Sequence, residues 1–338
     1  MNAPTPLPPL RQPKDYATDQ EVRWCPGCGD YAILKAVQKT LADLQADPAR
    51  TVFVSGIGCA ARFPYYIETY GFHTIHGRAP AVATGIKLAN PELDVWVVGG
   101  DGDMLSIGGN HLLHALRRNV DLTVLLFNNE IYGLTKGQAS PTSRAGTRSP
   151  STPLGSVDRP LSALKFALGA GGRFVARGID TQQKQLPEIL RRAHAHKGTA
   201  LVEILQNCIV YNDGAFAGFT AREVEADAQL HLVHGAPVIF GKARDKALRL
   251  AARGLALEVT TADDPAVLVH DERNPALASL LAALEPPFPV AVGILYDDPA
   301  PVTWEAAVHA QEAEAKAGAK VKDLAALLRQ GPTWTMPG

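Results

Sequence analysis

The sequence predicts an α/β fold in which a parallel β-sheet is covered by helices on both faces. Apolar runs of strand length alternate with segments whose apolar residues recur at helical spacing. The strand-like runs are apolar throughout, which is typical of strands buried on both faces. The turns of most unusual composition all follow strands, and ligand sites in such sheets lie beyond the carboxyl ends of the strands.

The elements alternate along the chain, beginning with a helix over residues 30–44 for which Asp30 is the expected N-cap. The other strands are expected at 51–55, 94–98, 122–127, 173–177 and 200–204, and the other helices at 78–88, 106–118, 161–171 and 182–196. We expect three regions: a proline-rich, flexible arm (1–19), the main domain (20–215) and a C-terminal extension of helical and mixed character (216–338).

Composition narrows the class of protein. The formal net charge of −1 gives no sequence-wide basic field of the kind that favours nucleic acid. The longest apolar runs are of strand length, and the N-terminus has no apolar signal core. We therefore expect a cytoplasmic protein that binds neither nucleic acid nor a membrane.

Two neighbouring strands are followed by oxygen ligands and glycines. Asp101 stands between Gly100 and Gly102 after one strand, and Asn129 follows the next strand. Carboxylate and amide oxygens suit Mg²⁺, which usually keeps phosphate oxygens in its coordination shell. Glycines allow backbone N–H groups to approach a phosphate, and the helix that begins near Ser106 offers the positive end of its dipole. The pattern predicts a magnesium and phosphate site.

The four cysteines form one closely spaced pair and two scattered thiols. Cys25 and Cys28 lie in a CPGC turn, whereas Cys59 and Cys208 each follow a strand. A single CxxC is compatible with zinc, a redox dithiol or an iron–sulfur cluster. Cys59 and Cys208, taken separately, are also compatible with small buried core residues.

The segment from Gly100 to Asn129 resembles the diphosphate-binding motif of thiamine-diphosphate enzymes. The resemblance implies that Mg²⁺ is held by Asp101, Asn129 and the backbone carbonyl of Ile131. It also implies that the diphosphate lies on Gly100, Gly102 and Asp103.

A wider set of motifs resembles the β subunits of 2-oxoacid:ferredoxin oxidoreductases over most of residues 20–295. The motifs are CPGCG, GIGC, HGRA, GDGD, NNEIYGLTKGQASPT and a late cysteine, with HDERNPALASLL and PFPVAVGIL near the end. The resemblance implies the thiamine-diphosphate-binding fold and one [4Fe-4S] cluster on Cys25, Cys28, Cys59 and Cys208. It further implies cofactor contacts from Ile57, Gly58, Ala60, His76, Leu134 and Thr135.

The family's chemistry would require partners. The resemblance implies CoA-dependent oxidative decarboxylation of a 2-oxoacid, with electrons passing through the cluster to ferredoxin, or the reverse carboxylation. The sequence contains one sheet unit with the diphosphate motif and no second unit. The pyrimidine-binding domain is therefore expected on an α subunit or a fused γ/α chain, in an α2β2 assembly.

Loop residues near the predicted site favour one substrate. Arg62 follows Cys59 by three residues and could pair with the distal carboxylate of 2-oxoglutarate, and Lys136 offers a second positive charge. Leu134 is expected to approach the thiazolium ring. The segment CAARFPYY also resembles the 2-oxoglutarate branch of the family more than the pyruvate branch.

Three other functions remain open at this point. A pyruvate or branched-chain 2-oxoacid enzyme would share the mechanism. A zinc-binding structural or regulatory subunit could keep the fold without catalysis. A non-oxidative thiamine decarboxylase would leave the four cysteines unexplained.

Overall fold

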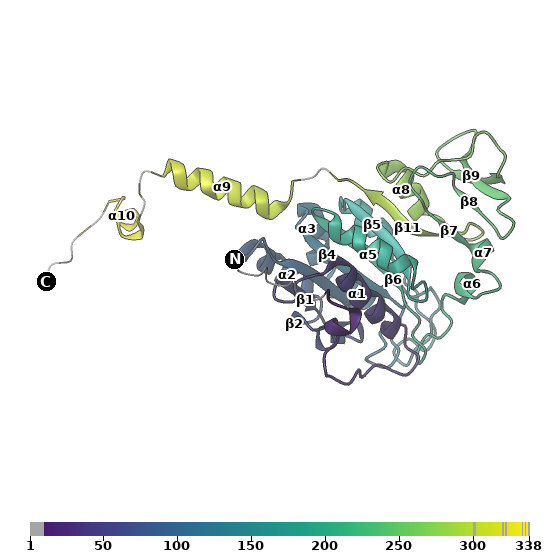
Figure 1. Cartoon of the computed structure of the whole chain (residues 1–338), viewed down its shortest axis with the longest axis horizontal. Coiled ribbons are helices and arrows are strands. Elements are labelled where there is room, and N and C mark those ends of the chain that lie inside the picture. The colour runs from purple at the N-terminus through teal and green to yellow at the C-terminus, as the bar shows by residue number, and fades with distance from the viewer. Residues whose placement is uncertain are drawn as a thin grey trace, which may run out of the picture.

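The centre of the molecule is an eight-stranded sheet, seen in Figure 1. The structure is a computed structural model of the whole chain and describes residues 10–299, 302–319, 321, 323–332, 334 and 336. The strand order is β2-β1-β3-β4-β6-β5-β11-β7, and every neighbouring pair is parallel except β11 with β5. The strands are β1 (Thr51–Ser55), β2 (Tyr70–His73), β3 (Asp94–Gly100), β4 (Leu122–Asn128), β5 (Phe174–Ile179), β6 (Thr199–Leu205), β7 (Gln229–His231) and β11 (Val290–Asp297).

The strand order reverses beside β1. The chain leaves β1 to form β2 on one side and later returns to place β3 on the other side. Loops that leave neighbouring parallel strands in opposite directions open a crevice at the carboxyl edge, where open α/β sheets bind ligands. The crevice here lies between the turns that follow β1 and β3.

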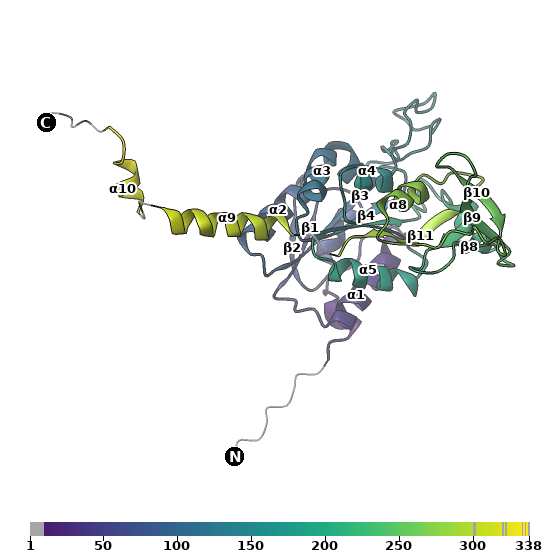
Figure 2. The ribbon, with the colours of Figure 1, turned by 90° about the horizontal axis from the view of Figure 1, so that it is seen from above.

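Side chains of the strands alternate between two apolar cores. In β3, Val95 and Val97 pack on one face, whereas Trp96 and Val98 pack on the other. Figure 2 shows the helices of the two layers on opposite sides of the sheet. The first layer contains α2 (Ala79–Ala89), α3 (Gly109–Arg118), α4 (Ala163–Gly169) and α8 (Pro275–Ala282), and the second contains α1 (Asp30–Leu44) and α5 (Gln185–Ala195). The predicted fold class is thus confirmed.

Every helix and strand predicted between residues 30 and 204 is present. The helix predicted at 106–118 is divided into η3 (Asp103–Ile107) and α3. One detail was wrong: Gly29, and not Asp30, is the N-cap of α1. Asp30 is the first helical residue, and its side chain makes no capping hydrogen bond.

The chain after residue 215 contributes to the main sheet and also forms a second, smaller one. Strands β7 and β11 extend the main sheet beyond β5. The smaller sheet is antiparallel, in the order β10-β9-β8. Its strands are β8 (Ile239–Phe240), β9 (Lys246–Leu250) and β10 (Leu257–Thr261), and two short helices, α6 (Ala217–Thr220) and α7 (Glu225–Ala228), precede it.

The N-terminal end of the described chain packs on the globular part, whereas the C-terminal end leads away from it. Residues 1–9 of the predicted N-terminal arm lie outside the described residues. The 3-10 helix η1 (Pro13–Tyr16) packs on α1. Its Tyr16 is fully buried, and the Tyr16 hydroxyl donates to the Ala46 carbonyl. At the other end, α9 (Trp304–Gly318) projects away from the sheet, as Figures 1 and 2 show, and α10 (Leu324–Leu328) follows it. The base of α9 is held by Glu305, which is 3% exposed.

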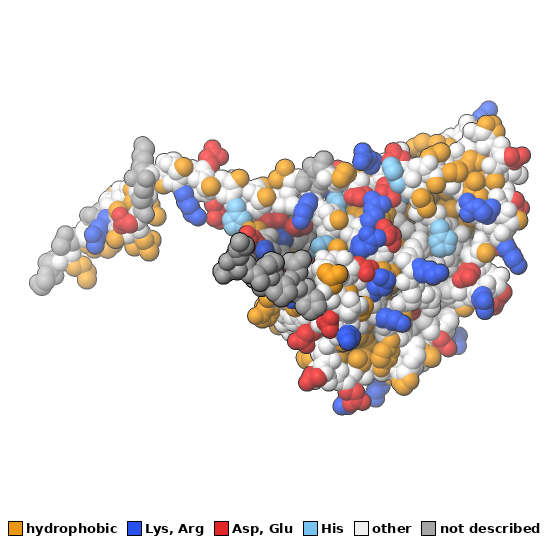
Figure 3. Space-filling view, in the orientation of Figure 1, with side chains coloured by type: hydrophobic (Ala, Val, Ile, Leu, Met, Phe, Trp, Pro, Cys, Tyr) orange, Lys and Arg blue, Asp and Glu red, His pale blue; other side chains and the backbone are white. Residues whose placement is uncertain are grey.

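The surface carries charges of both signs. Figure 3 shows Lys and Arg side chains intermixed with Asp and Glu on the face that it presents. Within the described residues, no helix combines the length and the apolar character that crossing a bilayer requires.

A buried ion pair supports the strand ends near the crevice, and its loss should be costly. The carboxylate of Glu203 accepts from Arg177 at 2.7 Å and from the Asn128 amide at 2.8 Å, and Glu203 is 1% exposed. Replacing Arg177 with methionine leaves a buried charge without its partner, so the free energy of unfolding should fall by about 3–5 kcal/mol. Chemical denaturation would measure the change.

The matched control is Arg191→Met, because Arg191 pairs with Glu188 on the exposed side of α5. We expect that substitution to change the free energy of unfolding by less than about 1 kcal/mol. Equal effects for the two variants would show that the buried pair adds nothing beyond a surface pair.

Candidate active site

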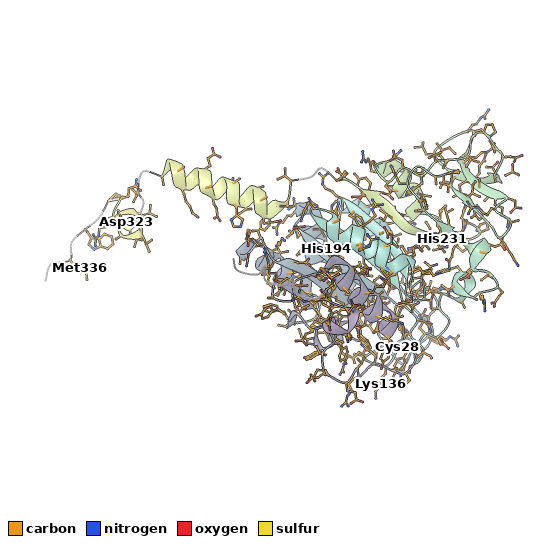
Figure 4. All side chains as sticks on the ribbon, viewed as in Figure 1. Cys28, Lys136, His194, His231, Asp323 and Met336 are labelled. Carbon is orange, nitrogen blue, oxygen red and sulfur yellow. The ribbon has the colours of Figure 1, made fainter. Side chains whose placement is uncertain are left out.

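The loops that follow the parallel strands meet at one edge of the sheet. They are the turns after β1, β3, β4 and β6, and the CPGCG turn that precedes α1 lies against them. Figure 4 shows Cys28 and Lys136 at this edge, with His194 toward the opposite edge, where β3 begins. The topology therefore gathers most of the predicted site residues in one place.

One cavity is lined by thirteen of the predicted residues, which are Cys59 and twelve others. It is bordered by Ile57, Gly58, Ala60, His76, Gly100, Asp101, Gly102, Asp103, Asn129, Ile131, Leu134 and Thr135. The same cavity also touches Cys59, Asp30 and Gln206, so the glycine-rich turns and the cysteine-bearing loops share a single space. Gly58 has a φ of +122°, and a Cβ there would meet nothing within 4 Å, so its backbone faces open space.

Asp101 is the buried carboxylate of this cavity. It is 2% exposed, and its Oδ2 accepts hydrogen bonds from the hydroxyls of Ser140 (2.6 Å) and Thr142 (2.5 Å). Burial raises the pKa of Asp101 to about 6. Ser140 and Thr142 belong to the loop between β4 and α4, and this loop folds back to orient Asp101.

Asp103 ties three loops together. Its Oδ1 accepts from the backbone N–H of Ile57 (3.1 Å), from that of Gly77 (2.7 Å) and from Nδ1 of His76 (2.5 Å). The carboxylate of Asp103 thus binds groups of the neighbouring loops. The backbone N–H of Asp103, and not its side chain, would contact a diphosphate. His76 lines the cavity, and Nε2 is the ring nitrogen that remains for a ligand.

The turn after β4 presents amide and carbonyl oxygens. The Oδ1 of Asn129 accepts from the backbone N–H of Ile131 at 3.1 Å, and its Nδ2 donates to Gln206 at 2.8 Å. Asn212 donates to the backbone carbonyl of Asn129 at 2.8 Å. A buried carboxylate, an amide oxygen and a carbonyl on adjacent strand ends form a donor set that fits Mg²⁺.

The four cysteines are free thiols on three segments. Cys25 is exposed, and the other three are partly buried. A Cβ on Gly133 would lie 3.6 Å from the sulfur of Cys59 and 3.5 Å from that of Cys208, so Gly133 lies beside both thiols. Among the described residues, no group of three or more His, Cys, Asp or Glu side chains is positioned to hold a metal ion.

Burial and neighbouring negative charge act on these thiols together. The pKa of Cys28 is raised, chiefly by burial and then by Asp30, with smaller effects from Cys59 and Cys208. The pKa of Cys59 is raised to about 12, again chiefly by burial. Gly133 lies beside the sulfurs of Cys59 and Cys208, and thiols from separate loops are the kind of donor that an iron–sulfur cluster takes.

Hydrogen bonds within the protein join the loops that carry the cysteines. The indole Nε1 of Trp24 donates to the carbonyl of Cys59 at 2.7 Å. The backbone N–H of Gly29 donates to the Asn207 carbonyl at 3.2 Å, and the N–H of Asn207 donates to Asp180 at 2.9 Å. Sequence reasoning missed Trp24 and Asp180, although Trp24 directly precedes the CPGC turn.

Asp30 lies deep between the cysteines and the cavity. It is 1% exposed, and both its carboxyl oxygens are buried without a hydrogen-bond partner in the described part of the chain. Burial raises the pKa of Asp30 to about 7. The residue expected to cap a helix is instead a buried carboxyl beside Cys28.

A second cavity adjoins the first and contains Arg62. The two cavities share Ile57, Gly58 and Leu134, and the second is also lined by Arg23, Tyr65, Tyr66 and His73. The Nε of Arg62 donates to the Tyr66 hydroxyl at 3.0 Å, which fixes one edge of the guanidinium. Lys136 lies in the turn after β4 with an exposed side chain and a φ of +76°, and it does not line either of these two cavities.

Comparison with known proteins gives a consistent set of relatives. Residues 56–204 match the family described as the thiamine pyrophosphate enzyme, C-terminal TPP binding domain. The chain is 52% identical over 286 residues to 2-oxoglutarate oxidoreductase subunit KorB of Mycobacterium tuberculosis, covering 82% of this chain and 76% of that subunit. It is 52% identical over 198 residues to 2-oxoacid:ferredoxin oxidoreductase 1, subunit beta, of Aeropyrum pernix, covering 59% of this chain and 62% of that subunit.

A solved structure is also similar over nearly the whole chain. It is the 2-oxoglutarate:ferredoxin oxidoreductase from Magnetococcus marinus with 2-oxoglutarate, coenzyme A and succinyl-CoA bound. The TM-score is 0.77 at 33% identity, and the match covers 96% of this chain and 97% of that chain.

Proposed function

This chain belongs to the β subunits of the 2-oxoacid:ferredoxin oxidoreductases, and we propose that its substrate is 2-oxoglutarate. In the proposed reaction, 2-oxoglutarate and CoA give succinyl-CoA, carbon dioxide and a proton, with two electrons passing to ferredoxin, or the reverse. The observation that carries the proposal is the shared cavity, in which the GDGD turn, the asparagine turn and Cys59 border the same space.

The chain carries the diphosphate-binding domain for thiamine diphosphate. We propose that Asp101, Asn129 and the Ile131 carbonyl hold Mg²⁺, with the diphosphate on the turn from Gly100 to Asp103. Thiamine diphosphate, when bound, supplies an electron sink for the carbanion that decarboxylation leaves. Ser140 and Thr142 orient the Asp101 carboxylate, because both hydroxyls donate to the same oxygen.

The proposed [4Fe-4S] cluster would be held by Cys25, Cys28, Cys59 and Cys208. Its chemistry, when bound, is one-electron transfer. Cys59 supports this assignment because it borders the cofactor cavity, so a group on its sulfur would lie next to the thiamine site. Analysis of iron and acid-labile sulfide against zinc would separate this proposal from a zinc-binding structural subunit.

As a β subunit, the chain acts with an α partner. We propose that this partner, or a fused γ/α chain, supplies the pyrimidine-binding domain in an α2β2 assembly, and that ferredoxin takes the electrons. A cytoplasmic location stays a prediction.

Arg62 supports 2-oxoglutarate as the substrate. Its guanidinium lies in the cavity that adjoins the cofactor cavity through Leu134, and a dicarboxylic oxoacid would extend its distal carboxylate into that space. An anchored guanidinium suits bidentate recognition of a carboxylate. Arg23 lines the same cavity, but it pairs with Glu21 at 2.8 Å.

Replacing Arg62 with methionine should therefore change substrate preference. We expect kcat/KM for 2-oxoglutarate to fall by about 10- to 100-fold, because a charged hydrogen bond of about 1.5–3 kcal/mol is lost. The value for pyruvate should stay within about threefold, since pyruvate has no distal carboxylate. The measurement is CoA-dependent viologen reduction by the anaerobically co-purified complex.

Arg23→Met is the matched control and should retain the preference of the unaltered enzyme for 2-oxoglutarate. Preference of the unaltered enzyme for pyruvate would overturn the substrate and leave the family intact. Loss of 2-oxoglutarate activity in the Arg23 variant alone would assign the carboxylate to Arg23.

A further inference from the structure

Gln206 connects the cation site to the cysteine site. It is the first residue after β6, and it is 1% exposed. Strands β4 and β6 pair in parallel with Asn128 opposite Leu205, so the next residues, Asn129 and Gln206, leave the sheet side by side. The backbone N–H of Gln206 donates to the Asn128 carbonyl at 2.8 Å, which holds the two strand ends together.

The two ends of the Gln206 side chain face different groups. Its Oε1 accepts from Nδ2 of Asn129 at 2.8 Å. Its Nε2 donates to the sulfur of Cys28 at 3.3 Å and to the Asn207 carbonyl at 2.6 Å. One buried amide therefore touches a proposed magnesium ligand and a proposed cluster ligand.

We propose that Gln206 is a positioning residue that holds Asn129 in its cation-binding orientation and raises the reduction potential of the cluster through Cys28. The proposal rests on the function proposed above, because it needs a cluster on Cys28 and a cation on Asn129. Gln206 has no ionisable group, so its effect is that of a fixed dipole.

The first part of the proposal concerns the orientation of Asn129. An asparagine amide presents oxygen on one side and nitrogen on the other, and a cation binds only the oxygen. Because Gln206 accepts from Nδ2, the Oδ1 of Asn129 is turned away from Gln206. Without that acceptor, only the N–H of Ile131 at 3.1 Å would hold the Asn129 amide, so the amide could rotate and place its NH₂ group toward the cation.

The second part concerns the sulfur of Cys28. Hydrogen bonds to cluster sulfurs are among the factors that set the potential of iron–sulfur centres. An N–H donor stabilises the more negative, reduced state more than the oxidised state. Removing the donor should therefore shift the midpoint potential to a more negative value.

Two substitutions separate the two parts. Gln206→Glu keeps an oxygen acceptor for Asn129 and loses the N–H donor to Cys28, whereas Gln206→Met loses both. The control is Gln182→Glu, because Gln182 is an amide outside the site that donates to Gln229 at 2.7 Å. Each variant would be purified anaerobically with its α partner.

Three quantities would be measured: iron and sulfide content, the cluster midpoint potential by titration followed by electron paramagnetic resonance, and the affinity for Mg²⁺ and thiamine diphosphate by calorimetry. We expect full cluster content and a more negative potential in both Gln206 variants. The cofactor affinity should fall about tenfold in Gln206→Met and stay within about threefold in Gln206→Glu. Gln182→Glu should match the unaltered complex in all three.

The outcomes distinguish this inference from the proposed function. An unaltered complex without iron and sulfide would overturn both. A normal unaltered complex, with an unchanged potential in both Gln206 variants, would overturn the role toward Cys28 alone. Equal cofactor affinity in Gln206→Met and the unaltered complex would overturn the role toward Asn129.

Discussion

Replacing Asp101 with asparagine is expected to weaken the binding of Mg²⁺ and thiamine diphosphate by at least about 100-fold and to remove turnover. The side chain keeps its shape, and its oxygen can still accept from the hydroxyls of Ser140 and Thr142. The negative charge is lost, and an NH₂ group, which cannot bind a cation, replaces the second carboxylate oxygen. Because the carboxylate is buried, water cannot replace that charge toward a cation.

Calorimetric titration of the purified complex with the cofactor would measure the affinity, and viologen reduction would measure turnover. The matched control is Asp43→Asn, since Asp43 pairs with Lys39 on the solvent side of α1. Asp101→Ala should lose activity as well. Full activity in either Asp101 variant would show that the diphosphate site has been assigned to the wrong turn.

Replacing Gly29 with alanine is expected to empty the cysteine site. The added Cβ would lie 2.0 Å from Oδ2 of Asp180, a side chain that is 4% exposed and holds the N–H of Asn207 at 2.9 Å. If the Asp180 side chain moves to make room, it loses the hydrogen bond from the N–H of Asn207, the residue before Cys208. The CPGCG turn and the loop after β6 should therefore separate.

We expect less than about half the normal iron and sulfide per chain, and a matching loss of ferredoxin-linked activity. The reason is that metal sites lose affinity when the residues that orient their ligands are disturbed. Gly85→Ala is the control, because a Cβ there would meet nothing within 4 Å. That helical substitution should keep the metal and add about 0.5–1 kcal/mol of stability. Normal iron content in Gly29→Ala would mean that the loops are held by other contacts.

The sequence predicted the central strands because each is a short run of buried apolar residues between helical segments. Strand β2 was not predicted because all four of its residues are exposed, so it lacks the buried apolar run. Strand β7 was not predicted because it is only three residues long. The return of β11 to the sheet depends on pairing with β5, more than a hundred residues earlier in the chain. Local periodicity contains no information on such a pairing.

The turns of the site could also be predicted, because GDGD and the asparagine pair are local patterns. The contacts of Gln206 with Cys28 and of Asn207 with Asp180 join segments far apart in the sequence, so spacing could not reveal them. The same reason explains the error at Asp30. The helix has the expected bounds, but its N-cap is Gly29, a glycine that packs against Asp180.

The bonds that fasten the cysteine loops have a consequence for how the protein matures in the cell. They join an indole, backbone amides and a carboxylate, and none of them requires a metal. In a zinc finger, by contrast, metal binding supplies the free energy of folding. Here the contacts that join the loops are all made by the polypeptide, so we expect the chain to be folded before it receives the proposed cluster, and a chain without iron should still unfold cooperatively.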